Sequence, residues 1–316
     1  MFERTTPGSA DRPLAGMFLM VLSVFLFTTM DMLVKLAAEH HPTGQIVFFR
    51  NLVAFIPVTF FVMRAGGLGQ LRTRRPFAHM LRGAFGLAAM VSFFLAYKLL
   101  PLGEAVALGM AGPLFITALS VPLLAEKVGI RRWSAVVIGF VGVLVMTRPG
   151  SALFDPAAFV ALAGALFYAI AMILIRRLSR SEPVVAIVFY FTAFATVASA
   201  ASLPWQWATP DLEGWALLVG IGLIGGVAQM TMTQAFQQAP AALLAPLDYL
   251  ALVFAMLYGL WIWNERPDAF LTAGAAIVVV AGLYILHRET VLARQRGRAV
   301  ARAAGHDRQG DKPGGG

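Results

Sequence analysis

Charged side chains inside long apolar stretches are the residues of this sequence best placed to do chemistry. Asp31 and Arg50 each lie six residues or so from the adjoining ends of the first two apolar stretches. A helical rise of 1.5 Å per residue places both about 9 Å below the same surface. Buried charge in hydrocarbon costs roughly 2.5 kcal/mol or more, so each charge needs a partner or a function. Two interpretations stay open: a substrate anchor or outer gate, and a structural ion pair, with Lys35 one turn outward.

A polar stripe on a later apolar stretch is a second candidate for substrate contact. Gln229, Thr233 and Gln237 recur every four residues and therefore share one helical face. Amides and hydroxyls in lipid need hydrogen-bond partners, and a wet central cavity would supply them. The alternative is hydrogen bonding between neighbouring helices.

Asp248 stands in the next apolar stretch, beside Tyr249 and two residues after Pro246. A carboxyl at this depth suits proton coupling or recognition of a cationic group, and the alternative is a hydrogen-bonded structural aspartate. Helix interruptions accompany it: Pro246 here, and in the corresponding earlier stretch Gly109, Gly112 and Pro113. Broken helices at matching positions of two halves point to a carrier's binding site.

Arg82 follows a basic connector at the start of the third apolar stretch. It is either an anion contact in an inner vestibule or an arginine that extends to the lipid interface. Both interpretations stay open.

The composition indicates what kind of elements hold these residues. Of 316 residues, 59% are hydrophobic and 13% charged, whereas soluble domains carry about 25% charged residues. Cysteine is absent and the five histidines lack metal-ligand spacing, so we expect no metal and no cofactor. The net charge of +9 lies mostly in short connectors and the tail, which is typical of membrane topology and not of a nucleic-acid-binding protein.

The hydropathy pattern predicts an all-α polytopic membrane protein with ten transmembrane helices. Their approximate spans are 15–37, 44–63, 78–98, 103–125, 132–148, 157–177, 184–203, 214–235, 242–263 and 267–286. With a cytoplasmic N-terminus, the outer helix ends carry just four basic residues, Lys35, Lys98, Arg148 and Arg266. The positive-inside rule therefore places both termini in the cytoplasm, residues 1–13 as a short segment and residues 288–316 as a basic, disordered tail.

The chain also repeats itself. Ile46–Arg50 (IVFFR) aligns with Ile187–Phe191 (IVFYF), and an offset shorter by two residues aligns Glu126 with Glu265. We interpret residues 14–150 and 151–287 as two five-helix repeats. An odd number of helices in each repeat gives the two opposite orientations, the architecture of alternating-access carriers. Glu126 and Glu265 are interpreted as anchors of helix ends and loops.

Several segments carry a resemblance to a known family. MDMLVKL and FFRN occur in the first two stretches, RRPFAHMLRG leads into the third, and LPLGEAVALGMAGPL begins the fourth. The sequence resembles the EamA-type branch of the drug/metabolite transporter superfamily over almost its whole apolar length, and its first half resembles the riboflavin and S-adenosylmethionine carriers in particular. The resemblance implies a carrier of a small organic metabolite in a bacterial inner membrane.

A secondary transporter is favoured, and it would move a vitamin, an S-adenosylmethionine-like solute or an amino-acid-like solute, with protons as a candidate coupling ion. The alternatives are a membrane sensor or scaffold and an exporter of drugs and toxic metabolites. An intramembrane enzyme is disfavoured because neither His nor Cys is placed for catalysis. The expected partners are the solute and the bilayer, without nucleic acid, and the chain is expected to be a monomer or homodimer.

Overall fold

The structure is a computed structural model that describes residues 13–124, 129–148, 155–179, 181–238, 244–285 and 287. Residues 1–12, Glu126 and the predicted tail from residue 288 lie outside the described residues. Every regular element in the described part of the chain is a helix, so the prediction of an all-α fold is confirmed.

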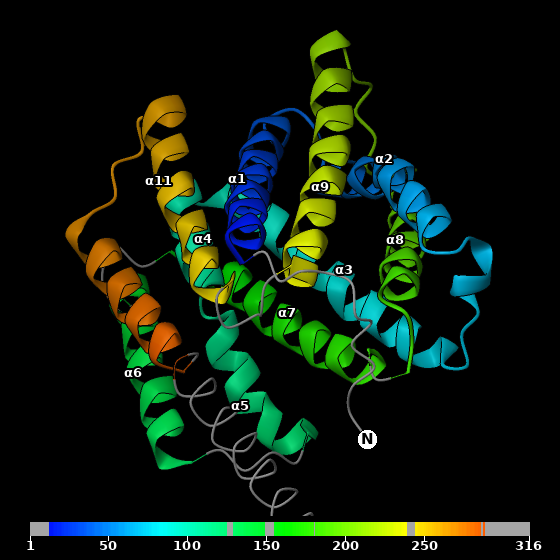
Figure 1. Cartoon of the computed structure of the whole chain (residues 1–316). Helices are drawn as coiled ribbons and strands as arrows, with labels where there is room; N and C mark the ends of the chain where they lie inside the picture. The colour runs from blue at the N-terminus through cyan, green and yellow to red at the C-terminus, as the bar shows by residue number, and fades with distance from the viewer. Residues whose placement is uncertain are drawn as a thin grey trace, which may run out of the picture.

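The helices follow the predicted spans closely (Figure 1). In the first half they are α1 (Pro13–Ala37), α2 (Thr43–Arg64), the 3-10 helix η1 (Leu68–Leu71), α3 (Pro76–Leu99), α4 (Leu102–Gly109), α5 (Gly112–Leu124) and α6 (Ile130–Thr147). In the second half they are α7 (Ala158–Leu178), α8 (Val184–Ala200), α9 (Leu212–Gln238), the 3-10 helix η2 (Ala245–Tyr249), α11 (Leu250–Trp263) and a last helix, Ala269–Ile285.

Proline and left-handed residues set several of these boundaries. A proline lacks the backbone N–H that the first helical turn leaves unbonded, so it is tolerated at that position. Prolines stand just before or at the first residue of five helices: Pro13 for α1, Pro42 for α2, Pro76 for α3, Pro101 for α4 and Pro183 for α8. Arg148 and Asn264 adopt φ values of 45° and 54° directly after α6 and α11, a left-handed conformation that ends a helix.

Length and surface both suit a lipid environment. Among the described residues, six helical stretches are long and apolar enough to cross a membrane, and four shorter apolar helices accompany them. Large apolar side chains also lie on the outer surface: Phe18 is 69% exposed, Ile56 67% and Val197 73%. Exposed apolar surface on this scale marks contact with lipid or with another protein.

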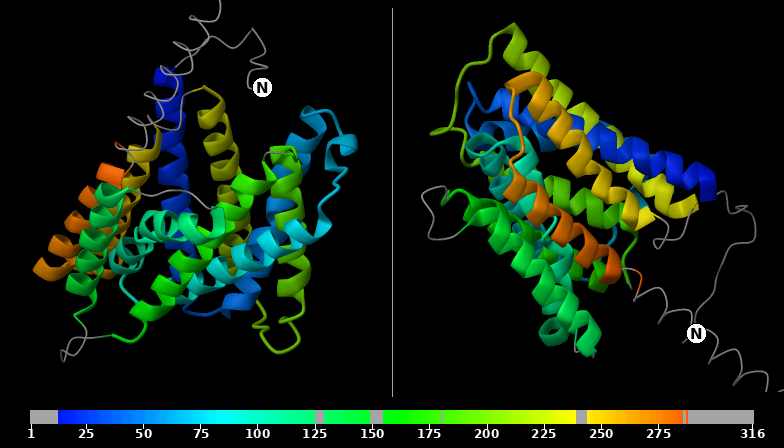
Figure 2. Two further views of the ribbon diagram at one scale, coloured as in Figure 1. Left: turned by 90° about the horizontal axis from the view of Figure 1, so that it is seen from below. Right: turned by 90° about the vertical axis from the view of Figure 1, so that its left-hand side faces the viewer.

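The two halves interleave instead of forming separate units. α1 packs most extensively against α9 and also contacts α11, whereas α3 packs on α7 and α8. α2 lies against α8 and α9, and α4 against α11. Figures 1 and 2 show α1 running beside α9, with α6 and the last helix at one edge of the molecule.

Small residues allow these helices to approach closely. α7 buries Ala161, Ala165 and Ala169 completely. A Cβ atom at Gly142 of α6 would stand 2.8 Å from the carbonyl oxygen of Gly274 in the last helix, so the two backbones are in direct contact there. Close packing through small residues is typical of helices in membranes.

One end of the molecule, here called the Lys35 end, joins several connectors through polar contacts. Lys35 binds Glu265 at 2.7 Å, and the side chain of Gln45 bonds both backbone groups of Ala208, at 2.9 and 3.1 Å. Arg148 bonds Asp268 at the start of the last helix. The connectors after α1, α3, α6, α8 and α11 therefore meet at this end.

The connectors after α2 and α7 meet at the opposite end, here called the Glu182 end. The backbone N–H of Arg74 donates to Glu182, whose other oxygen lies 3.6 Å from Nε2 of buried His79. The Tyr190 hydroxyl donates to the carbonyl of Leu71 at 2.7 Å. Polar contacts thus tie η1, α3 and α8 together at this end.

Candidate functional site

A cavity of about 250 Å³ lies between α1, α3 and α7, with one side chain of α8 at its edge. It is lined by Phe27, Met30, Asp31, Arg82, Gly86, Ala89, Met90, Phe93, Phe94, Tyr97, Tyr168, Ala171, Met172, Ile175 and Phe191. Two of these residues, Asp31 and Arg82, are charged, and six are aromatic. A mostly apolar cavity with a few polar groups is the usual form of a small-molecule site.

Asp31 lies on α1 and faces Tyr97 of α3. The hydroxyl of the buried Tyr97 donates a hydrogen bond to the Asp31 carboxylate. This bond holds the carboxylate at the cavity wall and leaves its remaining acceptor positions for another donor.

Arg50 approaches this pair without bonding to it. Its Nη1 donates to Oδ1 of the fully buried Asn51 at 3.2 Å, and its buried Nε has no hydrogen-bond partner among the described residues. The ion pairs between described residues do not include one between Asp31 and Arg50, although the two lie within electrostatic range. The direct ion pair suggested by their equal depth is therefore absent, because Tyr97 and Asn51 take the two side chains instead.

Arg82 extends into the same cavity. Its guanidinium carbon lies 3.8 Å from the centroid of the Phe191 ring, a cation–π contact. A Cβ atom at Gly86 would stand 2.6 Å from Nη1 of Arg82, so the glycine one turn along α3 leaves the room that the guanidinium occupies. Arg82 thus shares a cavity with Asp31.

Corresponding positions of the two halves line this cavity. The offset that aligns Ile46 with Ile187 also relates α1 and α7. It aligns three pairs of lining residues: Phe27 with Tyr168, Met30 with Ala171, and Asp31 with Met172. The cavity therefore lies where the two halves face each other.

The break between α4 and α5 supports two of the cavity's rings. α4 ends at Gly109 and α5 begins at Gly112, with Pro113 in its first turn. A Cβ atom at Gly109 would stand 3.2 Å from the ring of Phe93, and one at Gly112 would stand 3.2 Å from the ring of Tyr168. The small residues at the break therefore let both aromatic side chains pack closely against the backbone.

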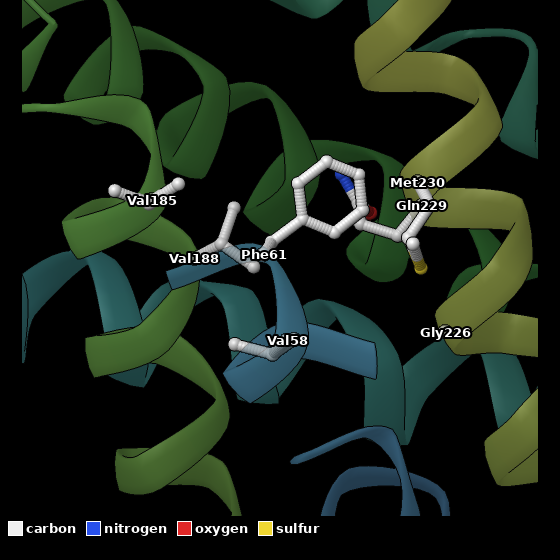
Figure 3. A pocket seen from close by; sticks show the side chains of 7 residues that line it. All are labelled: Val58, Phe61, Val185, Val188, Gly226, Gln229 and Met230. Carbon is white, nitrogen blue, oxygen red and sulfur yellow. The ribbon is translucent and has the colours of Figure 1, made fainter. Parts of the chain in front are cut away.

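Gln229 lies elsewhere. It lines a separate pocket of about 40 Å³ between α2, α8 and α9, and Figure 3 shows it among the other lining residues, which include Phe61. The side chains of Thr233, Gln237 and Pro246 lie outside the described residues. Gln229 and Asp31 therefore line two separate pockets.

Asp248 and its neighbour Tyr249 face different surroundings. Asp248 lies in η2 with an exposed side chain, within electrostatic range of Tyr168 in the cavity wall. The hydroxyl of Tyr249 instead lies against Gly282 of the last helix. Asp248 does not line the cavity, and Tyr249 points to the last helix.

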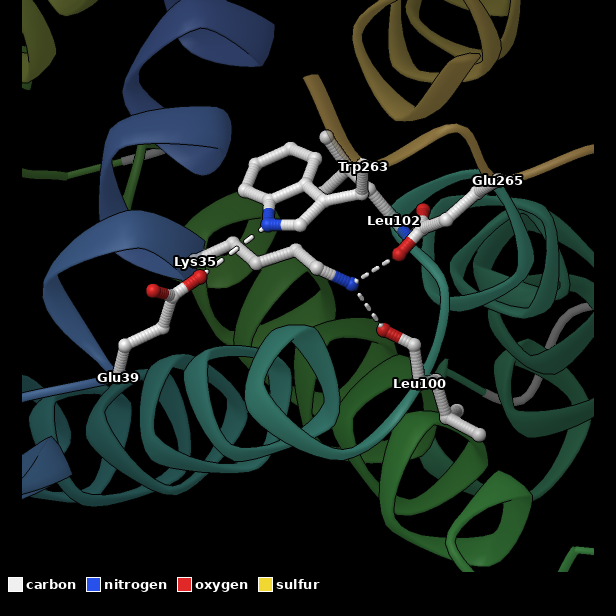
Figure 4. Close-up of polar contacts among 6 residues, drawn as sticks. All are labelled: Lys35, Glu39, Leu100, Leu102, Trp263 and Glu265. Atoms are coloured by element: carbon white, nitrogen blue, oxygen red, sulfur yellow. Dashed lines mark hydrogen bonds and ion pairs between the residues drawn. The ribbon is translucent and has the colours of Figure 1, made fainter. Parts of the chain in front are cut away.

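A cluster of polar contacts lies at the Lys35 end (Figure 4). The ammonium of Lys35 donates to Oε1 of Glu265 at 2.7 Å and to the carbonyl of Leu100 at 2.6 Å. Oε2 of Glu265 accepts the backbone N–H of Leu102 at 2.9 Å. Leu102 is the first residue of α4, where a carboxylate meets the positive end of the helix dipole.

Local backbone geometry aims Glu265 at this cluster. Asn264 in its left-handed conformation ends α11, and the backbone N–H of Glu265 then bonds the carbonyl of Gly259 at 2.9 Å. A Cβ atom at Gly259 would stand 2.9 Å from Oε2 of Glu265, so the carboxylate rests on a position without a side chain. The indole of Trp263 donates to Glu39 at 3.2 Å and lies 5.1 Å from the Lys35 ammonium.

Sequence reasoning did not identify three aromatic residues of the cavity. Tyr97, Tyr168 and Phe191 each contact or face a charged group of the site. The repeat offset could have found Tyr168, since Phe27 lies one turn before Asp31 on α1. Among the residues the structure describes, no group of three or more His, Cys, Asp or Glu is placed to hold a metal ion.

Several known transporters are similar in sequence to this chain. The pseudopaline exporter of Pseudomonas aeruginosa (strain UCBPP-PA14) is 32% identical over 272 residues, which cover 84% of this chain and 94% of the exporter. The S-adenosylmethionine uptake transporter of Rickettsia bellii is 30% identical over 274 residues, 87% of this chain and 93% of the transporter. The riboflavin transporter of Vibrio cholerae is 27% identical over 288 residues, 90% and 96% of the two chains.

The fold and the family agree with these relatives. A protein of known crystal structure superposes with a TM-score of 0.61 over 89% of this chain and 98% of its own, at 20% identity, a likeness of fold alone. The sequence model of the EamA-like transporter family matches twice, over residues 14–148 and 155–287. This multi-pass membrane protein, a transporter of a small metabolite, belongs to the EamA-like transporter family.

Proposed function

We propose that this chain is a secondary transporter that moves its metabolite across the bacterial inner membrane by alternating access, with the cavity around Asp31 and Arg82 as the substrate site. The observation that carries the proposal is the position of this cavity. Corresponding residues of α1 and α7 line it, and carriers built from inverted repeats bind their substrates between the repeats.

The proposal includes ten membrane crossings arranged as two inverted repeats, residues 14–150 and 151–287. The family match over two successive segments supports it. The helix packing supports it too. The repeat relates α1 to α7 and α3 to α9, so the contact of α1 with α9 is the counterpart of the contact of α7 with α3. The polar contacts of the connectors also segregate to two ends, as alternating crossings require.

The orientation follows from charge. We place the Lys35 end outside and the Glu182 end in the cytoplasm, together with both chain termini. The connector between α2 and α3, at the Glu182 end, carries Arg64, Arg72, Arg74 and Arg75, which fits the excess of basic residues in cytoplasmic loops. A single cysteine placed in that connector, in a chain that has none, should react with a membrane-impermeant thiol reagent from the cytoplasmic side alone.

We infer that the Lys35 end is the closed one in this state. Lys35 of the first half, the start of α4 and Glu265 of the second half are bonded together there, and these contacts would oppose the entry of a solute from that end. The outward-open state would separate Lys35 from Glu265, which gives them the role of an outer gate.

The relatives suggest the solute. S-adenosylmethionine combines a carboxylate with cationic groups, and the cavity offers Arg82 and Asp31 to such a pair of charges. Export is the second candidate direction, and the 32% identity to the pseudopaline exporter favours it. Asp248, beside Tyr168, is proposed to carry a coupling proton or to meet a cationic group on its way to the cavity.

Solute flux into proteoliposomes tests the proposal. Purified protein would be assayed with labelled S-adenosylmethionine, riboflavin and amino acids, with and without an imposed pH gradient. We expect at least one solute to enter faster than in empty vesicles and to exchange against itself. If none does so in either direction, the carrier proposal fails and a membrane sensor or scaffold becomes the better hypothesis.

A further inference from the structure

Arg82 is an incompletely bonded cation in the cavity wall. Its Nε and Nη1 atoms are buried and have no hydrogen-bond partner among the described residues. Buried donors in folded proteins are nearly always paired, and leaving a charged donor unpaired is costly. The described residues around Arg82 therefore provide no acceptor for these two N–H donors.

Within the part of the chain that the structure describes, the ion pairs do not include one with Arg82. One face of the guanidinium is covered by the Phe191 ring at 3.8 Å, and a ring face offers attraction but no strong acceptor. The nearby carboxylate, Asp31, accepts from Tyr97 and lies in range of Arg50. Arg50 in turn lies in electrostatic range of Arg82, and Arg82 and Asp31 line the same cavity.

We propose that Arg82 is the residue that binds a carboxylate of the transported solute, and that the solute is an amino-acid-type zwitterion whose cationic group lies toward Asp31. The inference rests on the transporter function proposed above and narrows its substrate class. Beside the ring contact, the Nε and Nη1 groups of Arg82 are without an acceptor among the described residues, and charged hydrogen bonds to carboxylates are among the strong ones.

The rest of the cavity suits the remainder of such a solute. Phe27, Phe93 and Tyr168 line it beside the charged groups and would pack against an apolar or ring-bearing side chain. Gly86 helps to position Arg82, because the absence of a side chain at Gly86 leaves room for Nη1 of Arg82. Replacing Gly86 by alanine would therefore push the guanidinium away from its position while leaving the charge in the chain.

A matched pair of solutes tests the role of the carboxylate. S-adenosylmethionine and its decarboxylated form differ by that group alone, and phenylalanine with phenethylamine forms a second pair. Binding to the purified full-length protein would be measured in detergent for each solute. We expect the wild type to prefer the carboxylated member of at least one pair by roughly tenfold or more.

Three variants and a control separate binding from folding. Arg82→Gln should lower the affinity for the carboxylated solute to that of its partner and leave the partner's affinity unchanged, whereas Arg82→Lys should keep part of the preference. Gly86→Ala should resemble Arg82→Gln. Arg64→Gln is the matched control, since Arg64 also lies over a ring, that of Phe60 at 5.6 Å, but at an exposed helix end. It should retain the full preference.

The outcomes distinguish this inference from the transporter proposal. One outcome would overturn the inference and leave the carrier proposal intact. In it, Arg82→Gln transports riboflavin, which has no carboxylate, at the wild-type rate, and the wild type shows no preference within either pair of solutes. An unchanged preference in Arg82→Gln, or no binding of any carboxylated solute by the wild type, also overturns it. Absence of flux for every solute would instead count against the transporter proposal.

Discussion

The ammonium of Lys35 and the carboxylate of Glu265 lie 2.7 Å apart. Their contact joins α1 to the connector between α11 and the last helix. Their side chains are 11% and 21% exposed, so water screens the pair less than a surface ion pair. The same carboxylate also holds the first backbone N–H of α4. Three parts of the chain that are distant in sequence thus depend on one side chain.

Removing the charge of this pair should open the Lys35 end more often. Glu265→Gln keeps an oxygen for Leu102 and loses the ion pair, which at about 1 kcal/mol corresponds to roughly a fivefold shift. A cysteine replacing Phe27 in the cavity would report opening through its labelling by an impermeant thiol reagent from outside. We expect labelling several times faster in Glu265→Gln and Lys35→Met than in the parent.

Lys98→Met provides the control for this experiment, since Lys98 is an exposed lysine in the last turn of α3. Its labelling rate should match that of the parent. Equal rates in all variants would mean that the Lys35–Glu265 pair does not hold the outer end closed.

Loss of the Asp31 carboxylate should affect transport more than loss of its hydrogen-bond donor. Asp31→Asn removes the negative charge that faces a cationic group, so we expect flux to fall by roughly tenfold or more. Tyr97→Phe keeps the ring and removes one hydrogen bond, so a fall of roughly two- to tenfold is expected. Initial rates in proteoliposomes, normalised to the protein incorporated, provide the measurement.

Tyr258→Phe is the matching control, because Tyr258 bonds Thr29 on α1 at 2.8 Å but does not line the cavity. Its flux should stay close to that of the wild type. A larger loss in Tyr258→Phe than in Tyr97→Phe would argue that these hydroxyls act on helix packing and not on the solute.

The start of the last helix should weaken in acid. The backbone N–H of Leu271 donates to Asp268 at 2.7 Å, and this bond, with help from Arg148, holds the pKa of Asp268 below its ordinary value. A lowered pKa in the folded state contributes stability above the unfolded pKa of about 4 and loses it as the pH falls through the folded value.

Thermal unfolding of the purified protein between pH 7 and pH 3 measures this contribution. Asp268→Asn can still cap the helix but does not titrate, so its loss of stability toward pH 3 should be smaller than that of the wild type. Asp268 is half exposed, and the difference should stay within about 1 kcal/mol. Parallel stability curves for the two proteins would remove Asp268 from the acid response.

Asp248 and Gln229 should differ in their effect on transport. Asp248→Asn removes a charge near Tyr168 of the cavity wall and should lower flux without changing membrane abundance. Gln229→Met introduces the residue found at the corresponding position of the first half, Met90, in a pocket separate from the cavity. It should retain most of the flux. The reverse order of effects would place the substrate against the polar face of α9.

The helices could be predicted well because their causes are local. Long apolar runs specify helices in lipid, and prolines such as Pro101 and Pro183 mark where helices begin. The interruption near Pro113 was likewise visible in the sequence, since Gly109 and Gly112 stand beside it. These signals need no knowledge of neighbouring helices.

The grouping of the site residues could not be predicted in the same way. Depth along a helix follows from sequence, but the direction of a side chain around the helix axis depends on how the helices pack. Asp31 and Arg50 are at one depth and yet bond to Tyr97 and Asn51. The contact of Glu265 with Leu102 joins residues far apart in the chain, and no local sequence pattern predicts it.

The shared carboxylate of Glu265 has a consequence for how the outer end moves. One oxygen serves Lys35 and the other serves the first turn of α4, and the side chain lies against Gly259, which has no side chain of its own. Rotating it away breaks both bonds in the same motion. We therefore expect this end of the protein to behave as a two-position switch, shut or released, with few populated positions in between.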